Sequence, residues 1–209
     1  MNKTNAKRII EVLGKIFPDK PMLNYSTPFE LLVAVILSAQ CTDERVNKVT
    51  KILFKDYNTP EELSKINVET LEKIIFSCGL YKNKAKHIIS ASKDILLRYN
   101  GQVPNTLEKL STLSGVGRKT ANVIYSVAFN GNAIAVDTHV FRVSNRLGLV
   151  CENNVTKTER ALMQILDEKD WSKSHHYLIY LGRNYCKAQK PDCQNCPVKD
   201  LCEKKIIKR

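Results

Sequence analysis

A chain of 209 residues with a formal net charge of +12 is long enough for one large domain or two small ones, and its charge suits a polyanionic partner. Nucleic acid is the first candidate, and an anionic membrane surface is the competing one. No stretch approaches the roughly 20 apolar residues of a membrane helix. The charged N-terminal segment lacks the apolar core of a secretory signal peptide. We therefore expect a cytoplasmic protein with no membrane partner.

Helical periodicity organises the first half of the chain. Apolar residues share one face of residues 4–17, and Pro18 stops that helix. The sequence Thr27-Pro28-Phe29-Glu30 is a strong helix start, with Thr at the N-cap and Pro at the first helical position. The helix that follows, 30–39, is apolar almost all round, which predicts a place in the middle of a domain. Further helices are predicted at 46–54, 61–66, 68–75 and 84–99.

Two glycines interrupt the helical pattern in the stretch from Leu113 to Ala121. Apolar residues recur every three or four positions on both sides, so the pattern predicts a helix, a tight hairpin and a second helix. The glycines let the backbone approach another molecule closely, and the unpaired amides that open the second helix suit a phosphate oxygen. A plain helix–helix turn is the alternative, but the basic residues Arg118 and Lys119 directly after the glycines favour binding to DNA. The expected contacts are Gly115, Val116, Gly117, Arg118 and Thr120.

The second half of the chain is also predicted to be helical. The second helix of the hairpin runs from Arg118 to about Phe129, and helices at 137–147, 156–166 and 172–185 follow it. The segment 132–136 is the one strand candidate, and it is brief. The sequence has no internal repeat and no low-complexity tract. It predicts an all-α fold.

Lys119 and Asp137 form the candidate catalytic pair. Taken alone, Lys119 is most often a solvent or phosphate contact, and an Asp directly before a helix is most often its N-cap. The helix at 118–129 spans roughly 18 Å, and the segment from 130 to 137 can stretch back over roughly 25 Å, so the carboxylate can return to the lysine. A neutral lysine amine attacks carbon electrophiles, and a neighbouring carboxylate can accept a proton or stabilise a positively charged sugar. The pair therefore suits covalent attack at an anomeric carbon.

Four of the seven cysteines crowd together near the C-terminus with the spacing C-x6-C-x2-C-x5-C. They are Cys186, Cys193, Cys196 and Cys202. In a chain without signs of secretion, such a group is more often a metal site than a disulfide framework. The uneven spacing favours an iron–sulfur cluster, although a four-cysteine zinc site stays open at this point. The other three, Cys41, Cys78 and Cys151, are predicted to be small buried apolar residues.

Three motifs together resemble the endonuclease III family of helix-hairpin-helix DNA glycosylases. They are Leu-Ser-Gly-Val-Gly-Arg-Lys-Thr-Ala-Asn-Val, Ile-Ala-Val-Asp-Thr-His-Val-Phe-Arg-Val and the 6-2-5 cysteine spacing, and the resemblance covers nearly the whole chain. It implies two helical domains with a DNA groove between them. One, 22–132, carries the hairpin, and the other joins 1–21 to 133–209 and holds a [4Fe-4S] cluster on the four cysteines. The cluster would be structural and would shape a basic loop, with Lys187 and Lys190, against the DNA backbone.

The resemblance also implies an activity, which is the removal of oxidised pyrimidines from duplex DNA followed by cleavage of the strand at the abasic site. Lys119 would attack C1′, expel the base and form a Schiff base that undergoes β-elimination, with Asp137 as the essential carboxylate. Gln40 and Leu80 fall where the family fills the gap left by a flipped base, although ordinary loop and core packing is the alternative for both. We expect a monomer.

Two positions depart from the family pattern, because Ser114 replaces a usual Pro and Cys41 replaces a usual Ala. Without the proline ring, the hairpin is expected to be slightly looser. A monofunctional adenine glycosylase is the nearest rival, but its relatives lack the lysine at position 119 and carry an extra C-terminal domain. A non-catalytic helix-hairpin-helix DNA-binding module would need neither Asp137 nor a cluster. A ferredoxin-like electron carrier would need neither the long upstream chain nor the charge.

Overall fold

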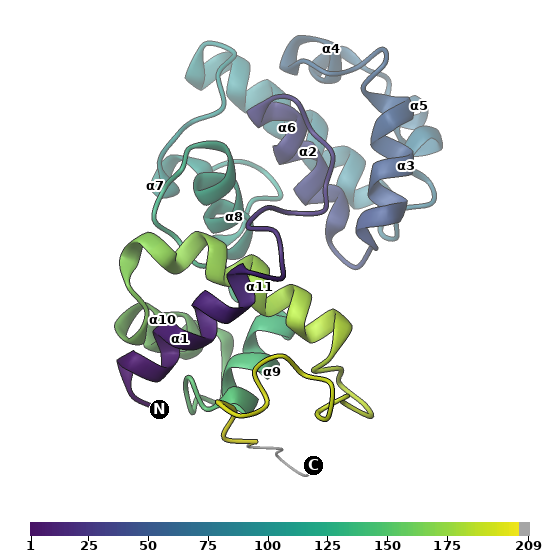
Figure 1. Cartoon of the computed structure of the whole chain (residues 1–209). Coiled ribbons are helices and arrows are strands. Elements are labelled where there is room, and N and C mark those ends of the chain that lie inside the picture. Colours follow the sequence, from purple (N-terminus) through teal and green to yellow (C-terminus); the bar gives the residue numbers. More distant parts are fainter. Residues whose placement is uncertain (205–209) are drawn as a thin grey trace. The chain divides into compact units, whose positions relative to one another are not determined.

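The computed structural model describes residues 1–204, and every regular element among them is a helix (Figure 1). The prediction of an all-α chain is therefore confirmed. The strand candidate at 132–136 is an extended segment without a strand partner in the described chain. The elements are α1 (Lys3–Gly14), α2 (Pro28–Ser38), α3 (Asp43–Leu53), α4 (Pro60–Lys65), α5 (Val68–Ile75), α6 (Tyr81–Tyr99), α7 (Leu107–Leu110), α8 (Arg118–Ala128), α9 (Thr138–Leu147), α10 (Val155–Ile165), the 3₁₀ turn η1 (Glu168–Asp170) and α11 (Trp171–Asn184).

The upstream arm of the predicted hairpin is shorter than its leucine pattern suggests, because α7 ends at Leu110. The hydroxyl of Ser111 donates to the Leu107 carbonyl at 2.7 Å, and the hydroxyl of Thr112 donates to the Lys109 carbonyl at 2.8 Å. These hydroxyl groups bond to carbonyls of the single turn of α7, where the chain leaves the helix and turns into the hairpin.

The chain divides into two compact units. We call Met22–Phe129 the hairpin unit, because it contains the glycine-rich stretch. The other, the cluster unit, joins Met1–Pro21 to the described chain from Asn130 onward and contains the four clustered cysteines. The predicted domain division had its boundary at 132, a few residues beyond Phe129.

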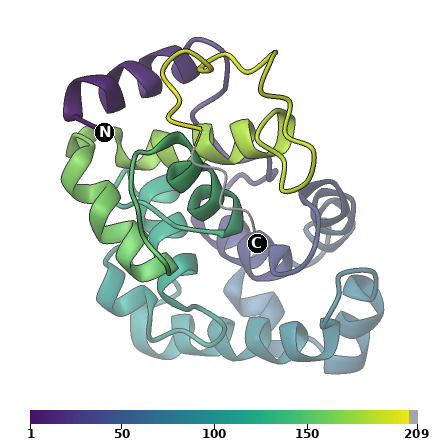
Figure 2. The ribbon, with the colours of Figure 1, turned by 90° about the horizontal axis from the view of Figure 1, so that it is seen from below.

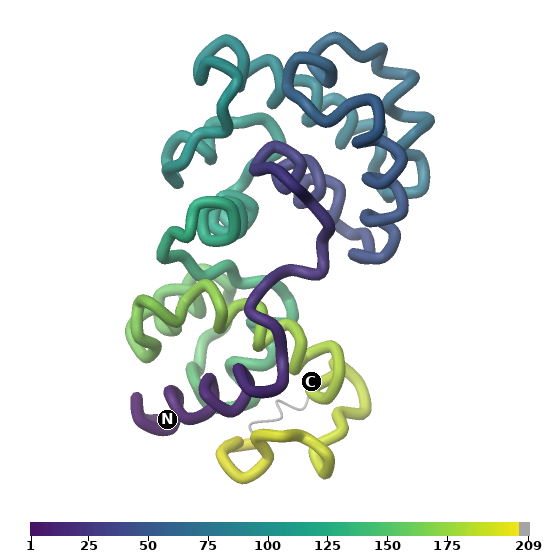
Figure 3. Tube along the Cα trace, turned by 45° about the horizontal axis from the view of Figure 1, so that its top comes forward, coloured from purple at the N-terminus to yellow at the C-terminus, as the bar shows by residue number. Residues whose placement is uncertain are grey.

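Helix α2 is the centre of the hairpin unit. Every residue from Phe29 to Leu37 is buried, as expected for a helix that is apolar almost all round. It packs against α3, α6 and α8, and Figures 1 and 3 show it between α8 and α3. The hydroxyl of Thr27 caps its first turn by accepting a hydrogen bond from the Glu30 amide at 3.1 Å. This buried helix gives a rigid base to the loops that follow its ends.

The cluster unit is built from both ends of the chain. Helix α1 packs against α11, and α11 packs along α9. Their apolar faces share one core that includes Ile9, Leu13, Val140, Leu178 and Leu181. After α11 the chain forms an irregular loop, yellow in Figure 2, that folds back beside this helix. The N-terminal helix and the C-terminal loop therefore depend on the same core.

Candidate functional site

The hairpin ends at the N-terminus of α8. Gly117 is the N-cap residue of α8, and no side chain in the described part of the chain caps this helix end. Val116 is buried and anchors the turn, whereas the side chains of Arg118 and Lys119 are exposed. A helix N-terminus with outward amides, no side-chain cap and two cationic residues is a ready binding site for phosphate. The predicted helix, hairpin and second helix are therefore present, with the first helix reduced to one turn.

Gly115 is required by both its conformation and its surroundings. Its φ of +78° lies in the left-handed region, and a Cβ at this position would lie 2.8 Å from the Cβ of His87. The hydroxyl of Ser114 is 3.0 Å from Nδ1 of the same histidine, so the hairpin is seated on α6. This bond offsets part of the freedom that Ser114 gains over a proline. At Gly117, by contrast, a Cβ would meet nothing within 4 Å. That face of the hairpin is open to a ligand.

The two candidate catalytic residues belong to different units. Lys119 is exposed in the first turn of α8, in the hairpin unit. Asp137, in the cluster unit, is the N-cap of α9, and its Oδ1 accepts a hydrogen bond from the Val140 amide at 2.8 Å. The N-cap position of Asp137 is thus observed. Its pairing with Lys119 stays a prediction.

Gln40 and Leu80 are both exposed, and both have left-handed backbone conformations, with φ of +53° and +60°. Residues other than glycine, asparagine and aspartate adopt this region rarely, and such outliers often mark functional loops. A Cβ on Gly79 would lie 3.7 Å from the carbonyl oxygen of Gln40, so the two loops lie against one another within the hairpin unit. Leu80 is 56% exposed, which argues against core packing.

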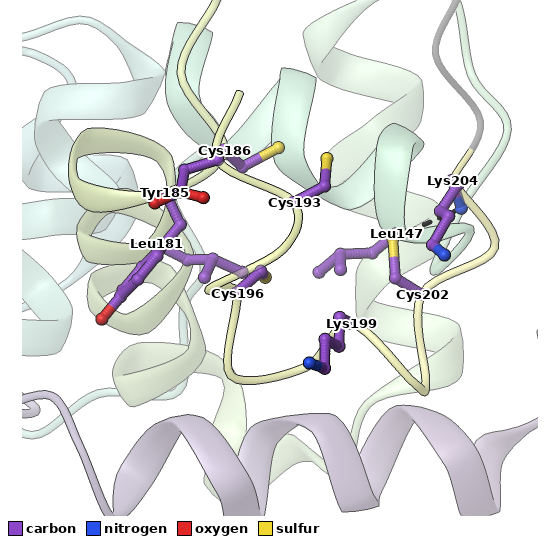
Figure 4. A pocket seen from close by; sticks show the side chains of 10 residues that line it. Leu147, Leu181, Tyr185, Cys186, Cys193, Cys196, Lys199, Cys202 and Lys204 are labelled. Atoms are coloured by element: carbon purple, nitrogen blue, oxygen red, sulfur yellow. Dashed lines mark hydrogen bonds between the residues drawn. The ribbon is translucent and has the colours of Figure 1, made fainter. Parts of the chain in front are cut away.

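The four predicted metal ligands line one pocket, and Figure 4 shows their sulfur atoms around it. Leu147 of α9 and Leu181 of α11 also line the pocket. Within residues 1–204, no three His, Cys, Asp or Glu side chains converge closely enough to hold a single ion. The four thiols line a common space, and a cluster bound by four cysteines fits this donor set. Burial raises the pKa of the Cys196 and Cys202 thiols, a cost that a positively charged metal centre offsets.

Two arginines of α9 hold the loop that carries these cysteines. The Arg142 Nε donates to the Cys186 carbonyl at 3.0 Å, and Arg146 donates to the carbonyls of Lys187 at 2.6 Å and Ala188 at 3.0 Å. Sequence analysis missed both arginines. Their spacing of four residues, which places them on one face of the helix, was the available signal. Lys187 and Lys190 are exposed on this loop.

The three remaining cysteines were predicted to be buried, and this is correct only for Cys78. Cys41 is half-buried in the turn after α2, and Cys151 is exposed in the turn before α10. Cysteine is buried more often than most residues, but a cysteine in a surface turn is exposed because the turn itself lies on the surface.

Comparison with known proteins defines the class first. Residues 33–168, more than half of the chain, match the HhH-GPD superfamily of base excision DNA repair proteins. Residues 186–202 match the iron-sulfur binding domain of endonuclease III. The hairpin and the cysteine loop are therefore the two defining parts of a base excision DNA repair protein.

The relatives narrow this class. Endonuclease III of Bacillus subtilis (strain 168) is 51% identical over 204 residues, which cover 95% of this chain and 93% of that protein. Endonuclease III of Escherichia coli (strain K12) is 44% identical over 209 residues, which cover 98% of each. The chain belongs to the endonuclease III family.

Solved structures agree with this assignment. A trapped endonuclease III–DNA covalent intermediate, described as an estranged-adenine complex, matches with a TM-score of 0.91 and 48% identity, over 98% of this chain and 97% of that one. A thermostable thymine-DNA glycosylase matches with a TM-score of 0.85, and at 22% identity it shows the shared fold alone.

Family membership establishes the enzyme class and the cofactor. The chain is a bifunctional DNA glycosylase and abasic-site lyase of base excision repair, and its four-cysteine loop holds a [4Fe-4S] cluster. The interpretation of the cysteine spacing as an iron–sulfur site is confirmed. The interpretation as a non-catalytic DNA-binding module is set aside. No helix within residues 1–204 is long and apolar enough to cross a membrane.

Proposed function

We propose that the chain removes oxidised pyrimidines from duplex DNA and then cleaves the strand at the resulting abasic site. One observation carries the proposal, which is the exposed Lys119 in the first turn of a helix that opens from a two-glycine hairpin without a side-chain cap. Because such a helix end attracts phosphate, a strand bound there brings deoxyribose near a lysine amine. The covalent endonuclease III–DNA intermediate among the similar structures supports the same chemistry.

In the proposed mechanism, the neutral amine of Lys119 attacks C1′ of the damaged nucleoside. The bond from C1′ to the base breaks, and its electron pair leaves with the base. Asp137 stabilises the positive charge that develops on the sugar and takes up the proton that the amine loses. The sugar ring then opens to a Schiff base. Removal of a C2′ proton and rupture of the C3′–O bond cut the strand.

We assign the binding of DNA to surface residues on both units. On the hairpin, the backbone at Gly115, Val116 and Gly117 and the residues Arg118 and Thr120 contact phosphates. Gln40 and Leu80 enter the base stack once the damaged nucleotide has left it, a role that their exposure and left-handed conformations support.

On the cluster unit, the exposed Lys187 and Lys190 contact the DNA backbone. The [4Fe-4S] cluster, when bound, supplies a covalent crosslink between the four cysteines, so the residues around it keep the shape of the loop. Arg142 and Arg146 anchor this loop to α9 independently of the metal. We further propose that the protein acts as a cytoplasmic monomer, which sedimentation of the purified protein alone and with one duplex would test.

Borohydride reduction tests the chemistry, because it converts a Schiff base into a stable amine and leaves the protein attached to the DNA. We expect the wild type to form this adduct with a duplex that contains 5-hydroxyuracil, and Lys119→Gln to form none. Lys109→Gln, which removes an exposed lysine from the upstream arm of the hairpin, is the matched control and should trap normally. A wild type that cleaves the duplex without any trapped adduct would contradict the lysine mechanism.

A further inference from the structure

One lysine of the hairpin unit is buried. Lys84, near the start of α6, is 4% exposed, whereas Lys82 and Lys86 on the same helix are exposed. Its Nζ donates to the carbonyls of Leu37 at 2.8 Å and Ala39 at 2.7 Å. No ion pair with a carboxylate is found for it in the described chain. A buried ammonium with neutral partners is costly, so its position calls for an explanation.

The acceptors of Lys84 lie where α2 ends. Helix α2 ends at Ser38. The carbonyls at the end of a helix have no backbone N–H group within the helix to bond to. They also carry the partial negative charge of the helix dipole, which favours a cation. Burial lowers the pKa of Lys84, and the thiols of Cys78 and Cys41 act in the opposite direction. The ammonium is thus held by the carbonyls at the end of α2.

The backbone of the same residue fixes the start of α6. The Lys84 amide donates to the Leu80 carbonyl at 3.1 Å, and this bond closes the first turn of the helix. Its side chain meanwhile binds Ala39, the residue directly before Gln40. Lys84 is therefore bonded at one end to the Leu80 segment and at the other to the Gln40 segment.

Both segments need such support. Gln40 and Leu80 stand in the left-handed region, which costs free energy for side chains of their type. Without an anchor, each would relax to a more common conformation and aim its side chain elsewhere. A Cβ built on Gly79 would lie in ordinary van der Waals range of the Gln40 carbonyl, so the two segments are neighbours in the arrangement that Lys84 holds.

We propose that Lys84 is a positioning residue for base extrusion, because it holds the Gln40 and Leu80 loops in the arrangement in which both side chains can enter the base stack. This inference rests on the proposed roles of Gln40 and Leu80. Lys84 is buried beneath the loops and takes no part in bond breaking. Its influence therefore falls on the step in which the damaged base leaves the duplex, a step that costs most when the base is paired.

The test compares one lesion in two contexts with the full chain and its cluster. One duplex has 5-hydroxyuracil paired with adenine, and the other has it opposite thymine, where pairing is poor. In single-turnover assays, Lys84→Met should slow base removal from the paired lesion by about 10- to 100-fold, the size expected for a small misplacement of side chains. The rate of base removal from the mismatched lesion should fall far less in the same variant. Lys82→Met removes a charge from the surface of the same turn and should not distinguish the two duplexes.

Equal losses on both duplexes, with an unchanged circular dichroism spectrum, would overturn the positioning role. If Lys84→Met fails to fold, Lys84→Arg provides the same test, because the planar guanidinium keeps the charge but does not reproduce a compact donor to two carbonyls. Its defect should also be confined to the paired lesion, and an equal defect on both duplexes would again overturn the inference. Borohydride trapping of the wild type separates this result from a failure of the proposed function, since that failure would abolish the adduct altogether.

Discussion

At the scale of single residues, Asp137 illustrates how a structural and a proposed catalytic role meet in one side chain. Its Oδ1 caps α9, and the described chain supplies no partner for its second oxygen. Aspartate and asparagine are equally good N-cap residues, because both offer a side-chain oxygen to the first amides of a helix. The two roles can therefore be separated by a single substitution.

We predict that Asp137→Asn keeps the fold and the affinity for damaged duplex but loses most of the turnover. The amide caps α9 as the carboxylate does, so the melting temperature should change by less than about 2 °C. It cannot accept a proton or stabilise a positive sugar as a carboxylate does, and base removal should slow by about 10²-fold or more. Single-turnover kinetics and gel-shift titration measure the two quantities. Normal turnover in this variant would remove Asp137 from the mechanism.

His176 is a second residue whose environment has a measurable effect. It is 3% exposed on α11, and its Nε2 has no hydrogen-bond partner within residues 1–204. Burial, with a smaller contribution from His175, lowers the pKa of His176 from 6.5 to about 3. The folded protein therefore keeps this ring neutral at pH values where the unfolded chain protonates it.

We predict that this histidine makes the protein acid-sensitive. Between about pH 6.5 and pH 3 the unfolded state binds one more proton at this site, so stability falls as the pH falls, by up to about 1.4 kcal/mol for each pH unit. Urea unfolding at pH 7 and pH 5 measures the change. A His176→Phe variant, which has no titrating group here, should show a smaller loss between these two values. An identical loss in both proteins would assign the acid sensitivity to other groups.

At the scale of the element, the hairpin depends on two glycines for different reasons. Gly115 has a positive φ and no room for a Cβ beside His87, whereas Gly117 has an ordinary φ and open space around it. We infer that Gly115 is needed for the turn to fold. Gly117 is needed for a DNA phosphate to approach the backbone closely.

We predict that Gly115→Ala lowers stability and Gly117→Ala does not. The left-handed conformation alone costs alanine about 1–2 kcal/mol, and the contact with His87 adds to this. Gly117→Ala should melt with the wild type but bind duplex DNA more weakly, because its methyl group stands between the backbone and a phosphate. Calorimetry and DNA titration of the two variants form a matched pair. Equal stability of the two would show that the hairpin tolerates a side chain against α6.

The elements also show what sequence can and cannot predict. Helices such as α2 and α4 were predictable because Thr-Pro-x-Glu starts act within a few residues, and the structure contains those caps. The cysteine spacing likewise favoured an iron–sulfur loop, and the family resemblance decided between iron–sulfur and zinc. The length of α7 was not predictable from its leucines, because Leu113 continues their spacing but is buried in the turn after the helix.

Contacts between distant segments were beyond the reach of local patterns. Lys84 reaches carbonyls that lie more than 40 residues earlier in the chain, and no local rule connects a lysine to the end of another helix. Lys84 does occupy the buried face of α6, which continues with Ile88, Ala91 and Ile95. A charged residue on the apolar face of a helix is the sequence signal for a buried hydrogen-bond partner.

At the scale of the whole molecule, the net charge of +12 governs how tightly DNA is held. Each phosphate that a cationic side chain neutralises releases counterions and contributes about −0.9 to the slope of log affinity against log salt. We predict a steep linear plot between 50 and 200 mM salt for the wild type, in fluorescence anisotropy with an uncleavable abasic duplex. Arg118→Ala should reduce the slope by about one unit. A slope unchanged by this substitution would mean that Arg118 does not contact a phosphate.

The construction of the cluster unit from both chain ends has a consequence for biosynthesis. The hairpin unit is one continuous segment, Met22–Phe129, and can fold as soon as it emerges from the ribosome. Helix α1 precedes this segment in the chain, yet its apolar face packs on α11, which follows the segment. Helix α1 must therefore stay without this partner until α11 has been translated. Nascent chains halted before Trp171 should accordingly expose α1 to proteases and chaperones while the hairpin unit is already protected.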